Sequence, residues 1–165
     1  MSVSFEVTQR FTDLLVREAW ARDNSRFDEW VAFFDDELRY WAPSRLFLER
    51  GQENLGKAEL FCHIDEDKPG FLLRIKRLTS GLTYTDEPPP RTRRLITNVL
   101  VLEADDSNAE VISYFMMFRS HPGHPDESIV GHRRDKWVRR GADWRIRERM
   151  IVIDQDKLTS YLGLL

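Results

Sequence analysis

Cysteine is almost absent from this sequence, and its scarcity excludes several kinds of site. The single cysteine, Cys62, cannot form an internal disulfide framework. Multi-cysteine zinc sites and iron–sulfur clusters are excluded as well, because each takes several thiolates from one chain. A chain with one thiol is expected to work in a reducing cytoplasm.

Long apolar runs are also missing. No segment approaches the roughly 18 uninterrupted apolar residues of a membrane-spanning helix. The opening residues, MSVSFEVTQR, have neither the early positive charge nor the apolar stretch of a secretory signal. The sequence therefore predicts no contact with a membrane.

Neither sign of charge dominates. The chain has 25 basic and 28 acidic residues and a formal net charge of -3. This balance gives no positive field to concentrate on polyphosphate, so no nucleic-acid partner is expected.

Apolar residues make up 41% of the 165 and charged residues 32%, which is ordinary globular usage. The length suits one domain over residues 1–165.

The N-terminal part of the chain has helical periodicity. From Phe5 to about Arg22, apolar residues recur at helical spacing with charged residues between them, which predicts one amphipathic helix. Asn24 or Ser25 is expected to cap a short second helix with an aromatic stripe. Farther on, residues 71–82 predict a third helix, with Gly81 suited to its C-terminal end.

Strand-forming residues dominate the rest of the chain. ELRYWAP, residues 37–43, predicts a short strand, and residues 44–56 predict a loop. Four long β-rich runs follow, at residues 95–104, 109–120, 128–140 and 142–154. Helices followed by a meander of antiparallel strands predict an α+β fold, with the helices packed on one face of a curved sheet.

The last of these runs alternates between two kinds of side chain. Its apolar members are Trp144, Ile146, Met150 and Val152, and its arginines are Arg145, Arg147 and Arg149. In a strand the two sets would lie on opposite faces of the sheet. We expect one face to belong to the core and the other to meet water or a partner.

Histidines and an acid offer one candidate metal site. His121, His124 and Asp126 lie close together in HPGHPDE, and two histidines with one carboxylate can bind iron. The prolines and the glycine of this segment are typical of a hairpin connection, in which histidine needs no ligand role. We adopt the hairpin interpretation.

Acid–base catalysis inside the fold is a second hypothesis. Asp35, Asp36 or Tyr40 would lie near the opening of the fold, with His132 on a strand as the partner. An apolar pocket can raise the pKa of a carboxyl group toward neutrality and make it a proton carrier. Acids at helix ends and a cross-strand histidine are the simpler interpretation.

Arginine greatly outnumbers lysine, which is typical of an interface. Guanidinium groups suit desolvated, bidentate pairing with carboxylates, and tryptophans supply the bulk that interface cores favour. The tryptophans in question are Trp30, Trp41, Trp137 and Trp144. A solvated arginine-rich sheet, with the tryptophans in its own core, is the alternative.

The order of the segments resembles a known family. Three stretches carry the likeness: REAWARDNSRFDEWVAFFDDELRYWAPSR, LLRIKRLTSGLTYTDEPPPRTRRLITNVLV and VGHRRDKWVRRGADWRIRERMIVID. Together they resemble the small, β subunit of bacterial Rieske-type aromatic-ring-hydroxylating dioxygenases. The likeness covers most of the chain. Its most specific matches are Arg74, Arg77, Leu78, Pro90 to Arg93, Asn98, Gly131, Arg133, Asp135, Arg149 and Asp154.

This resemblance implies a cone-like α+β fold, in which a strongly curved antiparallel sheet packs on N-terminal helices, as in ketosteroid isomerases, scytalone dehydratases and the nuclear transport factor. It implies a structural subunit with no catalytic residue, metal or cofactor of its own. The partner would be a large α subunit that carries a Rieske 2Fe-2S cluster and a mononuclear non-heme iron. Members of the family commonly assemble as α3β3 hexamers with contacts among the β subunits. The complex would dihydroxylate an aromatic compound in aromatic hydrocarbon catabolism, with electrons supplied indirectly by a reductase or ferredoxin.

Charged residues are the candidates for subunit contacts or for structural ion pairs. Pro88 to Pro90 restrict the backbone and would deliver the chain rigidly into a strand that begins near Arg94. Arginines there would be held at the rim of the sheet, where they could bond to the α subunit, to another β subunit or to acids of the same chain. The candidates are Arg74, Arg77, Arg91, Arg93, Arg94, Arg133, Asp135 and Arg149.

The same fold leaves a second function open. A stand-alone isomerase, dehydratase or small-ligand binder would use the interior of the cone. Iron content, oligomer size and oxygen uptake that depends on an aromatic compound would distinguish the two functions.

Overall fold

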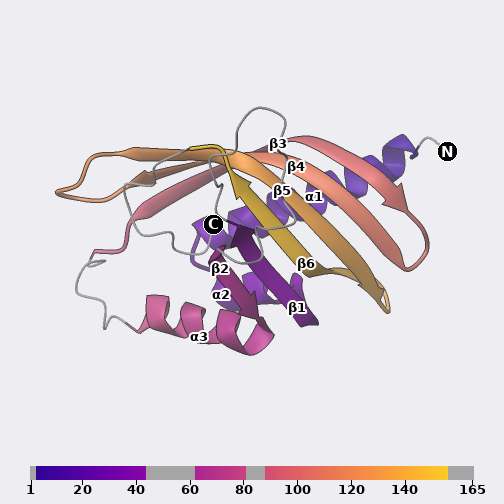
Figure 1. Ribbon diagram of the computed structural model, residues 1–165, viewed down its shortest axis with the longest axis horizontal. Helices are drawn as coiled ribbons and strands as arrows, with labels where there is room; N and C mark the ends of the chain where they lie inside the picture. Colours follow the sequence, from indigo (N-terminus) through magenta and orange to yellow (C-terminus); the bar gives the residue numbers. More distant parts are fainter. Residues whose placement is uncertain (1–2, 44–61, 81–87, 156–165) are drawn as a thin grey trace.

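The fold is built on one sheet of six strands, ordered β2-β1-β6-β5-β4-β3 (Figure 1). The computed structural model describes residues 3–43, 62–80 and 88–155. The helices are α1 (Phe5–Asp23), α2 (Phe27–Val31) and α3 (Lys68–Thr79). The strands are β1 (Phe34–Pro43), β2 (Cys62–Asp67), β3 (Arg91–Ala104), β4 (Asn108–Ser120), β5 (Glu127–Arg140) and β6 (Asp143–Ile153).

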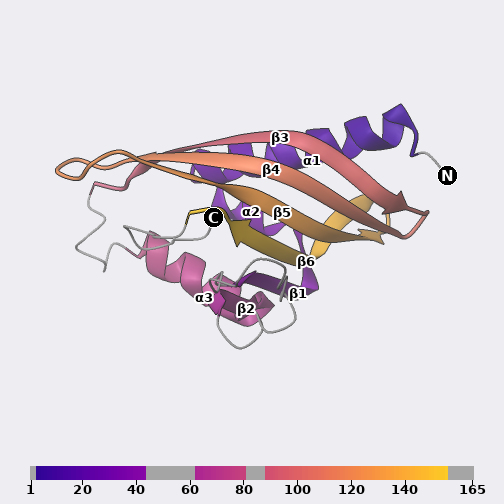
Figure 2. The same cartoon turned by 45° about the horizontal axis from the view of Figure 1, so that its top comes forward.

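The arrangement confirms the predicted α+β class. The long strands β3 to β6 form a curved antiparallel meander, and α1 runs along one face of it (Figures 1 and 2). One pairing differs from the prediction, because β1 and β6 are parallel. The short strand β2 pairs with β1 at one edge of the sheet, and α3 packs against these two strands.

Helix α1 forms where the apolar periodicity predicts it. Ser4 caps its N-terminus, with its hydroxyl oxygen accepting a hydrogen bond from the Val7 amide at 3.3 Å. Phe11 and Leu15 are buried against the sheet, and the Phe11 ring lies 5.5 Å from that of Trp137 between centroids. Neither α1 nor any other helix in the described part of the chain is long and apolar enough to cross a membrane.

A second aromatic cluster joins α2, β1 and α3. The Trp30 and Phe34 rings lie 5.4 Å apart, and the Phe71 ring lies 4.8 Å from that of Phe34. The predicted cap of α2 is wrong, because Arg26 is the N-cap residue and no side chain caps the helix. Ser25 instead adopts a positive φ of 57°, which turns the chain between the two helices.

Helix α3 begins three residues before the predicted start. The Asp67 carboxylate accepts a hydrogen bond from the Gly70 amide at 2.9 Å, and Pro69 lies in the first turn, so the helix starts at Lys68. Strand β2, which precedes it, was not predicted. The predicted loop at residues 44–56 and the predicted helix end at Gly81 lie outside the described residues.

A β-bulge in β6 reverses the predicted facing of Arg149. Trp137 lies opposite Ile146, but Lys136 lies opposite Glu148, so Arg147 is an extra residue in the pairing. Beyond this point the alternation changes phase, because a shift of one residue exchanges the two faces. Arg149 is therefore fully buried in the core, and the expectation that all three arginines of this run face outward is wrong.

The edge strand β3 has an irregularity of its own. It begins at Arg91, directly after the prolines and earlier than the predicted Arg94. Its pairing with β4 shifts between Thr97 and Leu100, and Asn98 adopts a positive φ of 51° there. Asparagine tolerates this left-handed conformation better than most residues, which suits it to the bulge.

Candidate functional site

An exposed apolar patch covers the outer face of the sheet, the face turned away from α1. Leu95 on β3 lies opposite Met116 on β4, which lies opposite Val130 on β5. Residues directly opposite one another share a face, so these three form a row across the strands. Their exposed fractions are 55%, 41% and 36%. The outer apolar patch consists of Leu95, Leu100, Tyr114, Met116, Phe118 and Val130.

Such a patch is unusual for a surface that meets only water. Single exposed apolar residues are common, but a contiguous group of them on neighbouring strands marks an interaction site. The patch includes two aromatic rings and a methionine, which are enriched in protein–protein interfaces. We therefore take the outer apolar patch as the candidate functional site.

Charges near the patch are largely paired within the chain. Arg134 on β5 forms an ion pair with Glu110 on β4. Lys136 Nζ lies 2.8 Å from Glu148 Oε2 on β6. Arg91 and Arg93 are different, since they are exposed on the outer face of β3 and have no ion pair with the other described residues. Arg93 lies opposite Phe118 and so borders the patch directly.

The inner side of the sheet holds a buried ionic network. Arg149 donates two hydrogen bonds to the Asp135 carboxylate, both of 2.8 Å, and a third of 2.9 Å to Glu18. Arg133 Nη1 donates to the other oxygen of Glu18 at 3.2 Å. The Trp30 indole also donates to Glu18, at 2.5 Å. Helix α1 is thereby tied to β5 and β6 through one carboxylate.

The network holds its carboxylate in the ionised form. Burial by itself would raise the pKa of Glu18, but the positive charges of Arg149 and Arg133 outweigh it and lower the pKa to about 2. Burial also opposes the charge of Arg149, yet Asp135 and Glu18 raise the pKa of its guanidinium above the usual value. A carboxylate fixed in this state serves as a structural anion and does not carry protons near neutral pH.

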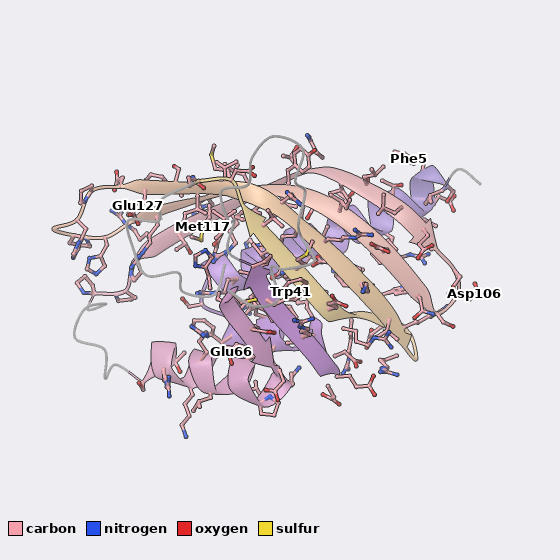
Figure 3. The ribbon with its side chains drawn as sticks, in the orientation of Figure 1. Phe5, Trp41, Glu66, Asp106, Met117 and Glu127 are labelled. Atoms are coloured by element: carbon pink, nitrogen blue, oxygen red, sulfur yellow. The ribbon has the colours of Figure 1, made fainter. Side chains whose placement is uncertain are left out.

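Two further ion pairs join elements that are distant in sequence. Asp23 at the end of α1 forms a buried ion pair with Arg94 on β3 and accepts a hydrogen bond from the Arg94 amide at 2.6 Å. Arg74 on α3 donates to Glu66 on β2 through Nη2 at 2.5 Å. Figure 3 shows Glu66 on β2, beside α3.

The structure divides the predicted charged residues into two groups. Most of them form ion pairs inside this chain: Arg74, Arg94, Arg133, Asp135 and Arg149. The others are exposed: Arg77 on α3, and Arg91 and Arg93 on β3. Only the exposed group is free to meet another subunit.

The candidate catalytic residues do not come together. Asp35 is held by Arg140, which donates to its two oxygens at 2.7 and 2.9 Å. Tyr40 is buried and stacks on Phe71 inside the fold, while His132 lies on the outer face opposite Tyr114. Tyr40 and His132 therefore lie on opposite faces of the sheet and cannot act as an acid–base pair, and Asp36 is exposed.

The histidine hairpin forms as the residues predict. The His121 and His124 rings lie 5.0 Å apart in the turn between β4 and β5. Across residues 3–43, 62–80 and 88–155, no group of three or more histidine, cysteine or acidic side chains is placed to hold a metal ion.

Sequence reasoning missed Glu18 and the outer apolar patch. Glu18 follows Phe11 by seven residues and Leu15 by three, so an acid occupies the apolar stripe of α1. An acid within an apolar helix stripe indicates a buried ion pair. Strand β4 carried another signal, because its run ISYFMMF has apolar or aromatic residues at nearly every position and does not alternate with polar ones.

Several proteins of known structure share this fold. The structure is similar to naphthalene 1,2-dioxygenase with indole bound in the active site, with a TM-score of 0.84 and 21% identity over 96% of this chain and 84% of that one. It is similar to the β subunit of benzoate 1,2-dioxygenase from Burkholderia mallei, with a TM-score of 0.76 and 18% identity over 99% of each chain. ActVI-ORFA from Streptomyces coelicolor shares the fold, with a TM-score of 0.64 and 12% identity over 92% of this chain and 97% of that one.

These structural likenesses establish the fold, and the family comes from the sequence. Residues 17–160 match the sequence model of the family described as the ring hydroxylating beta subunit. The match spans both the buried network and the outer apolar patch. The chain therefore belongs to the family of ring-hydroxylating β subunits, the small subunits of aromatic-ring-hydroxylating dioxygenases.

Proposed function

We propose that this chain is a structural subunit, and that copies of it meet one another through the outer apolar patch within an α3β3 hexamer. The observation that carries the proposal is the patch itself, an exposed row of apolar side chains across β3, β4 and β5. Burial of such a surface is the main driving force for association.

The charge around the patch favours a second copy as its occupant. The ion pairs Arg134–Glu110 and Lys136–Glu148 neutralise the charges of β4, β5 and β6 nearby. In a three-fold ring the contact joins two different surfaces, so the patch would pack on another part of the neighbouring copy, and the exposed arginines at its border would not face one another. Arg93 at its border would add hydrogen bonds to carboxylates or backbone carbonyls of the neighbouring copy.

The catalytic cofactors belong, in this proposal, to the α subunit. The α subunit would carry the Rieske 2Fe-2S cluster and the mononuclear iron, and electrons would arrive from a reductase or ferredoxin. One cysteine in this chain cannot supply a Rieske centre. The β subunits would hold neighbouring α subunits in place. A chain with a single thiol is suited to the cytoplasm, where we place the complex.

A stand-alone isomerase or dehydratase has less support. Such an enzyme would need an ionisable group inside the cone that exchanges protons near neutral pH. Glu18, a buried acid there, is held ionised by Arg149 and Arg133 and has a pKa of about 2. Asp35 is likewise engaged, and its hydrogen bonds with Arg140 lower the pKa of its carboxyl group.

The test is to place a charge in the middle of the patch. Met116→Glu should convert the isolated chain from a trimer to a monomer by analytical ultracentrifugation, with an unchanged circular dichroism spectrum. Val16→Glu is the matched control, because Val16 is 50% exposed on α1, on the other side of the sheet. A Met116→Glu variant that still forms trimers, or a control that dissociates equally, would contradict the proposal. Turnover of a small ketone or alcohol by the chain alone, without iron, would support the stand-alone enzyme instead.

A further inference from the structure

Helix α3 presents a second exposed face that the outer apolar patch does not explain. Leu72 and Leu73 are 42% and 52% exposed. Lys76 and Arg77 are also exposed, and they follow the leucines by four residues. Residues four apart lie on the same side of a helix, so the two leucines and the two cations form one continuous surface. We call these four residues the α3 face.

This face carries positive charge that the rest of the described chain does not balance. Helix α3 has four basic residues and no acidic one. Two of the four are engaged internally: Lys68 donates to the Phe34 carbonyl oxygen at 2.8 Å, and Arg74 pairs with Glu66. Lys76 and Arg77 have no ion pair with any residue that the structure describes.

Helix stability alone does not account for the arrangement. Cations in the last turn interact favourably with the helix dipole, which explains why Lys76 and Arg77 stand there. The dipole gives no reason for two exposed leucines beside them. A docking surface for an acidic partner combines apolar side chains with neighbouring positive charges, as this face does.

The α3 face and the outer apolar patch also lie on different parts of the sheet. Helix α3 packs on β1 and β2, at one edge, while the patch lies on β3, β4 and β5 toward the other edge (Figures 1 and 2). Both surfaces can therefore be occupied at the same time. Two copies could not join through their α3 faces, because the cations would repel one another.

We propose that the α3 face docks on an apolar surface of the α subunit that is bordered by carboxylates. This inference rests on the proposed function, since it assigns the two surfaces to two partners. The outer apolar patch joins β to β, and the α3 face joins β to α. Association through the α3 face is steered by charge and weakens as salt screens it.

The experiment measures binding of the chain to a tagged α subunit of the same dioxygenase at low and high salt. Lys76→Glu/Arg77→Glu should weaken binding by about tenfold or more and remove most of its salt dependence. Leu72→Ser/Leu73→Ser should weaken binding while leaving its salt dependence in place. Arg10→Glu/Arg17→Glu on α1 is the control, because it makes the same change in net charge on another exposed helix surface.

The outcomes separate this inference from the proposed function. Loss of α binding with the self-association of the chain unchanged supports the α3 face. Unchanged α binding by both α3 variants overturns it, without affecting the Met116→Glu result. Loss of self-association in Lys76→Glu/Arg77→Glu also overturns it, because the acidic surface would then belong to a second copy of this chain. Failure of the unaltered chain to bind any α subunit would refute the proposed function itself.

Discussion

Arg149 and Asp135 face each other across β5 and β6 and share two hydrogen bonds of 2.8 Å, with both side chains buried. This pair exists because the bulge at Arg147 turns Arg149 inward. The stability of the Arg149–Asp135 pair depends on Glu18, which supplies the second negative charge next to Arg149.

Asp135→Asn should lower the free energy of unfolding by about 3 kcal/mol, because it leaves part of a buried cation without its counter-charge. Urea unfolding at fixed protein concentration measures the loss. Glu110→Gln is the control, since it breaks a partly exposed ion pair with Arg134 and should cost less than about 1 kcal/mol. Equal losses in the two variants would contradict the role of the network.

Stability should fall in acid through Glu18. Its pKa is about 2 in the folded protein and 4.5 without the protein environment, so the unfolded state binds more protons between these values. The stabilisation, about 3 kcal/mol, is therefore complete above pH 4.5 and is lost as the pH falls toward 2. In Glu18→Gln this contribution is absent, so its unfolding free energy should approach that of the unaltered protein as the pH drops. Parallel pH curves for the two proteins would refute the assignment.

Deletion of Arg147 should leave Arg149 facing the core. Arg147 is the extra residue of the bulge, so after its removal Glu148 and Arg149 keep Lys136 and Asp135 as their partners in a regular ladder. Near-ultraviolet circular dichroism should keep its fixed tryptophan signal, and loss of that signal would contradict this pairing. Arg147→Ala keeps the chain length and replaces an exposed side chain, so it should change stability by less than about 0.5 kcal/mol.

Arg93→Ala should loosen the assembly and leave the isolated subunit folded. Arg93 is exposed at the border of the outer apolar patch, opposite Phe118, and takes part in no ion pair with the other described residues. Analytical ultracentrifugation of the complex should show dissociation at higher protein concentration than for the unaltered protein. Arg10→Ala, at an exposed position of α1, is the comparison. An unchanged hexamer would count against a contact at Arg93.

The secondary structure was predicted correctly where the side chains have a clear periodicity. The apolar stripe of α1 and the β-rich runs of β3 to β6 were identified because their side chains repeat with the period of each element. Strand β2 was missed because CHIDED is short and mostly charged, and it is a strand only through its pairing with β1. The bulge in β6 has no local signature, so the facing of Arg149 could not be read from alternation.

The partners of the buried arginines could not be predicted from the sequence, because they lie far away along the chain. Glu18 is 131 residues from Arg149, and Asp23 is 71 residues from Arg94. Only the packing of α1 onto the sheet brings each pair together. The choice between an internal and an external partner was open from residue type alone, and the fold determined it for Arg94, Arg133 and Arg149.

The irregularity at Asn98 bears on how copies of this chain can join. Strand β3 is an edge strand, and an unbroken edge invites another sheet to add strand after strand without limit. At Asn98 the backbone leaves the regular ladder, so an incoming strand would lose its register halfway along. Growth into fibres by edge pairing is thereby discouraged, so the proposed contact through the broad side of the sheet would have no competition from this edge.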